Sequence, residues 1–277
     1  MISIFKNTYN FAEQLPEYER EGFLSPIPLL SVEEAKFYRG KLEELEGHLG
    51  GEVRRFDFSH LFFDWAYDLA MHPVLLDYME QLIGPEIFLQ SVRIFNKPVG
   101  DPSFVTWHQD GRHSNLKSSS APTVWIALSH STRESGCLKV VSGSHNMGIL
   151  KHSENYVEEN LLTEGDIAEI IIQEEKVRHI ELRPGEMSIH HVNTLHSSLP
   201  NNSKDRRLGF SMTFISPVGE ENSLRGIPAR GKRQYPNLIH EFFKGRPTYS
   251  MEMGIAKHKE LAKKMGLPLW RGLKLEK

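Results

Sequence analysis

Hydrophobic and polar residues follow two different periods along this chain, and the period changes near residue 86. In the segment SVEEAKFYRGKLEELEGHLGG the apolar residues recur at nearly helical spacing: Val32, Ala35, Leu42, Leu45 and Leu49. Ser31 precedes Glu34 by three residues, as in a capping box, and Gly50 and Gly51 end the segment. Two more helices are predicted over SHLFFDWAYDLAMH and over PVLLDYMEQLIG, which begins with a proline and ends with a glycine.

After residue 86 the chain consists of short runs of branched and aromatic residues separated by turn-forming stretches, which is the pattern of strands. The candidate strands are IFLQSVRIFNK, FVTWHQD, TVWIALSH, CLKVV, VRHIEL, MSIHHV and RLGFSMTFI. Most of them have no helix-length pattern between them, so a sandwich or barrel is expected rather than a parallel α/β sheet. Residues 146–176 are long, acidic and poorly patterned for strands, and are interpreted as an insertion.

The last segment is a basic, loop-like stretch followed by MEMGIAKHKELAKKMGL, which has an amphipathic helical pattern. The simplest organisation is one domain over residues 1–277. It has a helical part over 1–85, a β core over 86–217 that carries the insertion, and a loop and helix over 218–277.

Composition narrows the function. The chain has 33 basic and 36 acidic side chains, a net charge of -3 and a pI near 6.5, which favours neither nucleic acid nor an anionic membrane as a partner. Cys137 is the only cysteine, so a disulfide framework and a multi-cysteine metal site are excluded and a reducing cytoplasm is expected. No stretch has the roughly 20 apolar residues of a membrane span, nor does the N-terminus look like a signal peptide. An enzyme acting on a small molecule fits best.

The segment TWHQDGRH carries the first candidate site residues, His108 and Asp110. Two histidines and one carboxylate form the facial triad that binds non-haem iron(II) and leaves positions open. Residues i and i+2 share one face at a strand end, so both side chains can point inward. One His-x-Asp is expected by chance among 14 histidines, and the similar His-x-Glu pairs at His152, His179 and His258 lie in less suitable contexts.

The second histidine must come from a distant strand, and EMSIHHVNTLHSSLPN offers His190, His191 and His196; spacing alone leaves this choice open. Eleven residues after His196, Arg207 opens the strand RLGFSMTFI. There the arginine alternates with large apolar residues and shares a face with small and hydroxyl residues, which leaves room for a bound acid. A guanidinium can bind a carboxylate through two parallel hydrogen bonds.

His108-x-Asp110, then His196 roughly ninety residues later, then Arg207, resembles the signature of the phytanoyl-CoA dioxygenase family of Fe(II)/2-oxoglutarate oxygenases. More than half of the chain resembles that family in the same order. The segments that carry the resemblance are FNKPVGDPSFVTWHQDG, TVWIALSHSTRESGCLKVVSGSH, LRPGEMSIHHVNTLHSSLPNNSKDRRLGFSMTFI and LRGIPARGKRQY.

The resemblance implies a mainly β fold with flanking helices around a double-stranded β-helix, the jelly-roll or cupin-like core. It implies iron(II) on His108, Asp110 and His196, and 2-oxoglutarate held through its far carboxylate by Arg207, with Ser198 and Trp125 as auxiliary contacts. With O2, such enzymes decarboxylate 2-oxoglutarate to succinate and CO2 and usually hydroxylate an unactivated C–H bond. The expected substrate here is a small polar metabolite.

The acid at position 110 disfavours halogenation, because halogenating relatives have Ala or Gly there. Desaturation, epimerisation and ring formation stay open, as does a non-catalytic jelly-roll protein that binds a metal or ligand. Two sets of residues are candidates for substrate contacts. One set directly follows His108 and Asp110 in the sequence and could equally be a solvated loop: Arg112, His113 and Asn115. The other lies in the strand over residues 87–97 and comprises Gln90, Arg93 and Asn96.

Overall fold

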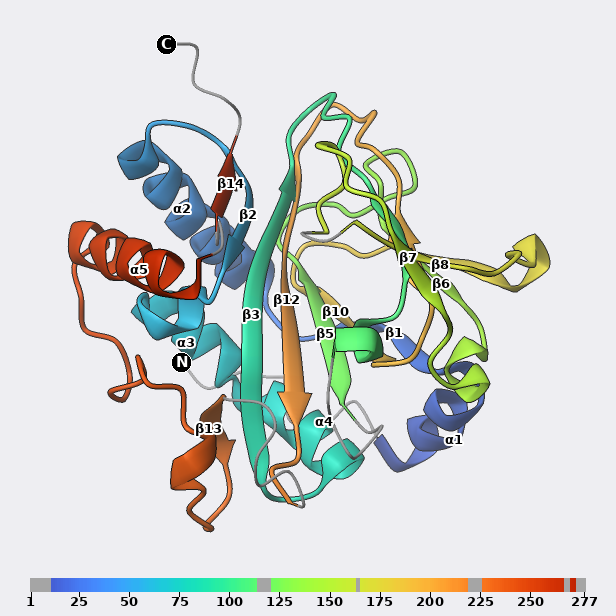
Figure 1. Ribbon diagram of the computed structural model, residues 1–277, viewed down its shortest axis with the longest axis horizontal. Coiled ribbons are helices and arrows are strands. Elements are labelled where there is room, and N and C mark those ends of the chain that lie inside the picture. Colours follow the sequence, from blue (N-terminus) through green and yellow to red (C-terminus); the bar gives the residue numbers. More distant parts are fainter. Residues whose placement is uncertain (1–10, 114–120, 163–164, 219–225, 267–269, 273–277) are drawn as a thin grey trace.

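The computed structural model describes residues 11–113, 121–162, 165–218, 226–266 and 270–272, and the core of this part is built from two antiparallel sheets. The large sheet has the strand order β1 (Phe23–Pro28), β10 (Glu186–His191), β5 (Pro122–Ala127), β12 (Arg207–Ile215), β3 (Ile87–Lys97), β2 (Val53–Asp57) and β14 (Trp270–Gly272), and β13 (Ile227–Arg230) also pairs with β3. The small sheet has the order β4 (Val105–His108), β11 (His196–Ser198), β6 (Leu138–Val141) and β9 (Val177–Ile180). Figure 1 shows the small sheet to the right of β3 and β12. This is the predicted jelly-roll core.

Helices cover the outer face of the large sheet. They are α2 (Val32–Leu49), α3 (Asp64–Ala70), α4 (Pro73–Ile83) and α5 (Met251–Met265), and Figure 1 shows α2, α3 and α5 to the left of β3 and α1 (Phe11–Glu21) beside β1 at the edge of the sheet. Side chains of α2, α3 and α4 form one buried cluster with the apolar side chains of β3 and β12, such as Ile94 and Phe210. Because that face is apolar, the opposite face of the same strands is free to carry polar groups. No helix in the described ranges is long and apolar enough to cross a membrane.

Most of the predicted elements are confirmed, including the ends of α2. The Ser31 side chain accepts from the Glu34 amide, the Glu34 carboxylate accepts from the Ser31 amide, and Gly50 adopts the left-handed conformation that ends the helix. The long strands β3 and β12 have the predicted bounds. The predicted helix over 59–72 is instead a short 3-10 turn, η1 (Ser59–Leu61), followed by α3. Leu61, Phe62 and Phe63 are all buried, which one face of a continuous helix cannot achieve.

The N-terminal part is not wholly helical, because it also supplies β1 and β2. The segment FLSPIP contains two prolines and pairs with β10 at the edge of the large sheet, where a missing amide is tolerated. The segment VRRFD pairs with β3 and brings arginines to that sheet.

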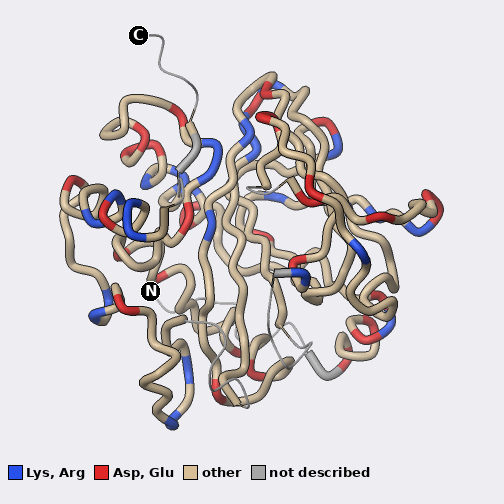
Figure 2. The backbone as a smooth tube through the Cα atoms, in the orientation of Figure 1, with Lys and Arg blue, Asp and Glu red and all other residues tan. Residues whose placement is uncertain are grey.

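Within the predicted insertion, β7 (His152–Glu154) and β8 (Asp166–Ala168) form a hairpin beside β4. Figure 2 shows acidic and basic residues interspersed along most of the described elements.

Candidate active site

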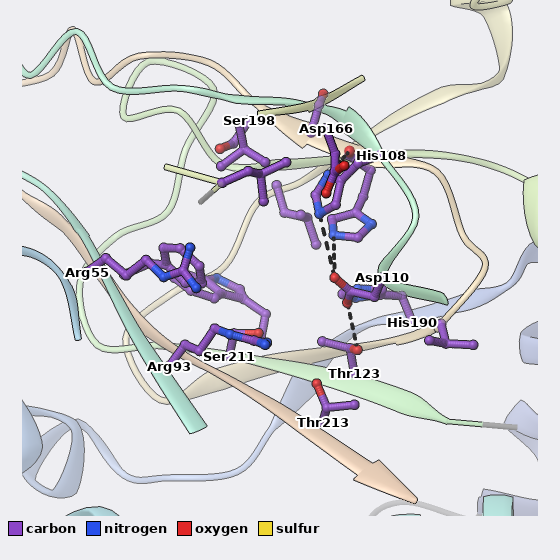
Figure 3. Close-up of a pocket in the computed structure, with 18 of the residues that line it drawn as sticks. Arg55, Arg93, His108, Asp110, Thr123, Asp166, His190, Ser198, Ser211 and Thr213 are labelled. Atoms are coloured by element: carbon purple, nitrogen blue, oxygen red, sulfur yellow. Dashed lines mark hydrogen bonds and ion pairs between the residues drawn. The ribbon is translucent and has the colours of Figure 1, made fainter. Parts of the chain in front are cut away.

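A cavity of about 320 Å³ lies between the two sheets. The large sheet contributes mainly polar residues to its wall, among them Gln90, Arg93, Thr123, Ser211 and Thr213. The small sheet contributes His108, His196 and Ser198, and the insertion contributes Leu162 and Asp166. Figure 3 shows Arg55 and Arg93 on one side of this cavity and His108 and Asp110 on the other. The inner face of the jelly roll is therefore a polar pocket.

His108, Asp110 and His196 converge at the inner end of this pocket. His108 ends β4 and His196 begins β11, and the two residues are direct antiparallel partners. Asp110 follows in a 3-10 turn, η2 (Asp110–His113). One potential ligand atom from each residue lies within 4.8 Å of the other two. Two strands far apart in sequence thus place two imidazoles and a carboxylate around one point.

Hydrogen bonds orient both imidazoles toward that point. His108 Nδ1 donates to the Thr106 carbonyl at 2.9 Å, and His196 Nδ1 donates to the Thr194 carbonyl at 2.9 Å. A nitrogen that faces a carbonyl must carry the proton, so Nε2 of each ring has a free lone pair. These Nε2 atoms lie 3.6 and 3.8 Å from Asp110 Oδ1. The donor set is therefore ordered before any metal arrives.

The charge state of the triad also suits a divalent cation. Burial, followed by the neighbouring His108, lowers the pKa of His196 well below its usual value, so its ring is neutral at physiological pH. Burial alone would raise the pKa of Asp110, but the imidazoles around it, His196 first, hold its pKa well below the usual range. Thr123 Oγ1 donates to Asp110 Oδ2 at 2.9 Å and leaves Oδ1 facing the imidazoles. Neutral imidazoles and an ionised carboxylate are the protonation states that metal ligands require.

The two other histidines that the sequence left open do not complete this group. His190 Nε2 lies 3.8 Å from Asp110 Oδ2, on the side of the carboxylate that Thr123 occupies, and its ring stands beside that of His196. His191 points to the other side of β10, where its ring lies 5.4 Å from that of His145. Among the described residues, the group whose ligand atoms are close enough to share a metal ion is the triad with His196.

Arg207 and Trp125 form a second subsite in the same pocket. The Arg207 side chain is 5% exposed, its guanidinium lies 4.6 Å from the centre of the Trp125 ring, and Nη2 approaches Ser198 Oγ at 3.4 Å. No carboxylate within the described ranges pairs with it, and its Nε has no acceptor there. Burial lowers the pKa of Arg207 to about 10, which still leaves it charged at neutral pH. A buried, charged and unpaired guanidinium fits an anionic ligand.

Gly209 allows Trp125 to lie in this place. A Cβ atom on residue 209 would stand 2.5 Å from the Trp125 ring and 2.4 Å from the Ile126 carbonyl oxygen, well inside van der Waals contact. Glycine is therefore required on β12 next to the arginine, and the run of small residues on this strand makes room for the indole that covers the guanidinium.

Lys97 is a part of this subsite that the sequence did not reveal. Its side chain is completely buried, and Nζ donates to Ser198 Oγ at 2.8 Å and to the Leu199 carbonyl. Burial, followed by the charge of Arg207, lowers the pKa of Lys97 well below its usual value. Because Ser198 Oγ accepts from Lys97, its own proton remains free to donate into the pocket. The signal was present in the alternation of Arg93, Phe95 and Lys97 along β3.

The predicted substrate residues divide into two groups. Gln90 and Arg93 line the pocket. Their spacing of three residues is possible because the pairing of β3 with β12 shifts register between Thr213 and Phe214. Asn96 does not line it, and that prediction is wrong. Its side chain faces the other side of β3, where it donates to the Val53 carbonyl and accepts from Arg206.

Arg112 is also outside the wall of the pocket. Its guanidinium binds Asp166 and Glu154. Arg112 therefore connects η2, the turn that also carries Asp110, to the β7–β8 hairpin instead of facing a substrate. The side chain of His113 and the whole of Asn115 lie outside the described residues. Arg55 on β2 was missed because no strand was predicted there, and it lines the pocket while binding Asp57.

Comparison with known proteins agrees with this architecture. The family model for phytanoyl-CoA dioxygenase matches residues 18–209, a range that contains the triad and Arg207. A probable alpha-ketoglutarate-dependent hypophosphite dioxygenase of Stutzerimonas stutzeri is 28% identical over 225 residues, which are 71% of this chain and 76% of that protein. The 1-deoxypentalenic acid 11-beta-hydroxylase of Streptomyces arenae is 30% identical over 170 residues, 58% of this chain and 59% of that protein.

A solved structure extends the similarity to almost the whole chain. The non-heme monooxygenase ThoJ in its apo form superposes with a TM-score of 0.74 at 25% identity, covering 92% of this chain and 95% of that one. The family model spans most of the length of this chain, and the relatives with which it aligns are named as 2-oxoglutarate-dependent dioxygenases and hydroxylases. The chain belongs to the phytanoyl-CoA dioxygenase family, and it is a 2-oxoglutarate-dependent dioxygenase.

Proposed function

We propose that this enzyme uses iron(II) and O2 to hydroxylate an unactivated C–H bond of a small polar metabolite while 2-oxoglutarate is decarboxylated to succinate and CO2. One observation carries this proposal. A triad of two imidazoles and a carboxylate opens into the same buried cavity as an arginine that has no carboxylate partner among the described residues. A protein that only bound a metal would not need this arginine beside the triad.

The triad would hold iron(II) through Nε2 of His108 and His196 and through Asp110 Oδ1. Iron(II) held by two histidines and one carboxylate keeps positions open for a chelating co-substrate and for O2, and it couples decarboxylation to oxidation of the substrate. The hydrogen bonds from the Nδ1 atoms to main-chain carbonyls fix the rings, and Thr123 fixes the carboxylate. The protein thereby contributes a rigid, correctly protonated donor set.

The arginine subsite would hold the far carboxylate of 2-oxoglutarate. Arg207 can donate two parallel hydrogen bonds to it, and Ser198, which accepts from Lys97, can donate a third. The Trp125 ring covers the guanidinium and keeps water away, which strengthens the pairing. These residues orient the co-substrate so that its other end reaches the triad.

The remaining space indicates the size and polarity of the substrate. A cavity of about 320 Å³ that also accommodates the co-substrate leaves room for a small molecule. Hydroxyl, amide and guanidinium groups of Thr213, Ser211, Gln90 and Arg93 line that space. The relatives named for hypophosphite and for 1-deoxypentalenic acid are consistent with a substrate that carries a polar group.

Anaerobic reconstitution tests the metal and co-substrate assignments. Iron(II) and 2-oxoglutarate added without O2 should give a weak visible charge-transfer band, and admission of O2 should then yield succinate. Asp110→Ala or His196→Ala should abolish both signals. His179→Ala is the matched control, since this histidine belongs to a His-x-Glu pair on β9 outside the pocket and its replacement should change neither signal. Both signals intact in Asp110→Ala would refute the assignment.

The mass of the product separates hydroxylation from the other reactions of this chemistry. A gain of one oxygen atom is the expected result in a screen for metabolites that stimulate succinate release. Loss of two hydrogens would indicate desaturation or ring closure, and an unchanged mass with altered stereochemistry would indicate epimerisation. Binding of metal and 2-oxoglutarate with no succinate under any condition would instead identify a non-catalytic jelly-roll protein.

A further inference from the structure

Arg93 is a second guanidinium in the pocket without an acidic partner. It projects from the middle of β3 into the cavity that the triad shares, and it is only partly buried. Its cross-strand neighbour on β12 is Ser211, and its neighbour on β2 is Asp57. The Asp57 carboxylate already accepts three hydrogen bonds from Arg55, at 2.7–3.1 Å. Within the described ranges no carboxylate lies within ion-pair distance of Arg93.

The other charges of the pocket balance one another when the proposed cofactors are bound. Two negative charges, Asp110 and the near carboxylate of 2-oxoglutarate, match the iron(II) ion, and the far carboxylate matches Arg207. Arg55 is neutralised by Asp57, and the Asp166 carboxylate is neutralised by Arg112. Lys97 does not line the pocket, and its Nζ donates to Ser198 Oγ and to the Leu199 carbonyl. Among the described residues that line the pocket, Arg93 is then the positive charge without a compensating carboxylate, and it lies in the space left for the substrate.

We propose that the substrate carries an oxyanion, such as a carboxylate or a phosphorus oxyacid group, which Arg93 binds beside the Ser211 hydroxyl. This inference rests on the proposed function and names the substrate class for the same site. A partly buried guanidinium next to a small hydroxyl residue can offer a fork of N–H donors and an O–H donor to one anion. The anion would fix the substrate at β3 and leave its other end toward the triad.

Arg93 is unsuited to replace Arg207 as the co-substrate anchor. Arg207 is the partner of Lys97, whereas Arg93 is the partner of Ser211, four residues further along β12. At about 3.3 Å per residue, the backbone positions of these two partners are roughly 13 Å apart along β12. Trp125 and Ser198 surround Arg207, and Arg93 instead stands on the side of the pocket with Arg55 (Figure 3). The two guanidiniums therefore define two anion subsites.

Binding measurements on a form that cannot turn over test this proposal. Protein loaded with Ni(II) and saturating 2-oxoglutarate is titrated calorimetrically with hypophosphite, inorganic phosphate and propionate, with propionamide as the neutral counterpart of propionate. At least one anion should bind wild type, and propionamide should not. Arg93→Gln should weaken that binding at least about tenfold, and Arg93→Lys, which keeps the charge but not the fork, should fall in between.

Two controls separate this test from that of the proposed function. Arg178→Gln removes the same charge from β9, where the guanidinium donates to two main-chain carbonyls and does not line the pocket, and should leave anion binding unchanged. The dissociation constant of 2-oxoglutarate, measured first, should stay within about twofold in Arg93→Gln. If no anion binds wild type, or if binding survives Arg93→Gln, the inference is overturned while the proposed function stands. If 2-oxoglutarate itself fails to bind wild type, the proposed function fails.

Discussion

At the scale of single residues, Arg206 and Arg207 have different roles because neighbouring side chains of a strand point to opposite faces of the sheet. Arg207 points into the pocket, whereas Arg206 points to the helical side and donates to both oxygens of Glu46, at 2.6 and 2.9 Å. This ion pair is buried, since Arg206 and Glu46 are 9% and 8% exposed where α2 covers this end of β12. One arginine therefore fixes the fold, and the other remains free to bind an acid.

Replacing Arg207 by lysine tests whether this arginine binds the carboxylate of 2-oxoglutarate. The ammonium keeps the charge but cannot make two parallel hydrogen bonds, so we expect the KM for 2-oxoglutarate to rise about tenfold or more, equivalent to about 1.4 kcal/mol of binding. The melting temperature of the apo protein should change by only a few degrees, since Arg207 makes one long hydrogen bond to Ser198 in this structure. Succinate release at varied 2-oxoglutarate concentration measures the first quantity. An unaltered KM would contradict the role of this residue.

At the scale of elements, α2 is fixed to the β core by Glu46 as well as by its apolar face. The Glu46 carboxylate accepts from Arg206 and also from the Val53 amide at the start of β2. The same side chain thus joins a helix, an edge region of the large sheet and the strand that carries Arg207. Its loss would leave a buried guanidinium with Asn96 Oδ1 as an acceptor and with the half-exposed acids Glu52 and Glu43 at 3.6 and 3.9 Å.

Glu46→Gln should therefore destabilise the fold without affecting the pocket. Breaking a buried ion pair costs about 3–5 kcal/mol, and the two nearby acids reduce this to an expected loss of about 2 kcal/mol in the free energy of unfolding. Urea denaturation measures it. Glu43→Gln, which removes an exposed partner of Arg39 on the same helix, is the control and should cost about 0.5 kcal/mol or less. Equal losses in both variants would show that burial adds nothing to this pair.

Periodicity revealed those elements whose sequence alone determines one buried face. This holds for α2 and α5, with their helical spacing, and for β3 and β12, with strong β propensity over 11 and 9 residues. It failed for β1, which contains prolines, and for β2, which contains arginines. Both are strands only because neighbouring strands, β10 and β3, offer them hydrogen bonds. Tertiary pairing of this kind leaves no local signal.

Local sequence patterns also predicted only a part of the candidate site. His108 and Asp110 are two residues apart and could be recognised locally, and the family resemblance supplied His196 and Arg207. Contacts that depend on three-dimensional packing were missed or misplaced. Lys97 reaches Ser198 across 101 positions, Arg55 enters the pocket from an unpredicted strand, and Asn96 faces away from it.

At the scale of the whole molecule, the large sheet separates an apolar layer from a polar cavity. One face of β3 and β12 packs Ile94 and Phe210 against the helices, and the other carries Arg93 and Arg207 into the pocket. Histidines are buried in the helical layer as well. His258 on α5 is 3% exposed, its ring stacks on Phe56 at 3.9 Å, and its Nε2 donates to the Asp57 carbonyl at 2.8 Å. These contacts hold a neutral imidazole in the layer that supports β2.

The buried histidine makes stability depend on pH. Burial lowers the pKa of His258 to about 4, whereas an unfolded histidine titrates near 6.5. Between these values the unfolded chain binds a proton that the folded protein does not, so the free energy of unfolding falls as pH drops, by up to about 1.4 kcal/mol per pH unit. From pH 7 to pH 5, His258 alone should remove roughly 2 kcal/mol from the free energy of unfolding.

In His258→Gln this contribution is absent. Although less stable at pH 7, the variant should therefore lose roughly 2 kcal/mol less than wild type on acidification, measured by urea unfolding of the metal-free proteins. Parallel losses in both proteins would mean that His258 is protonated in the folded state, and the stacked, hydrogen-bonded ring would then not keep it neutral.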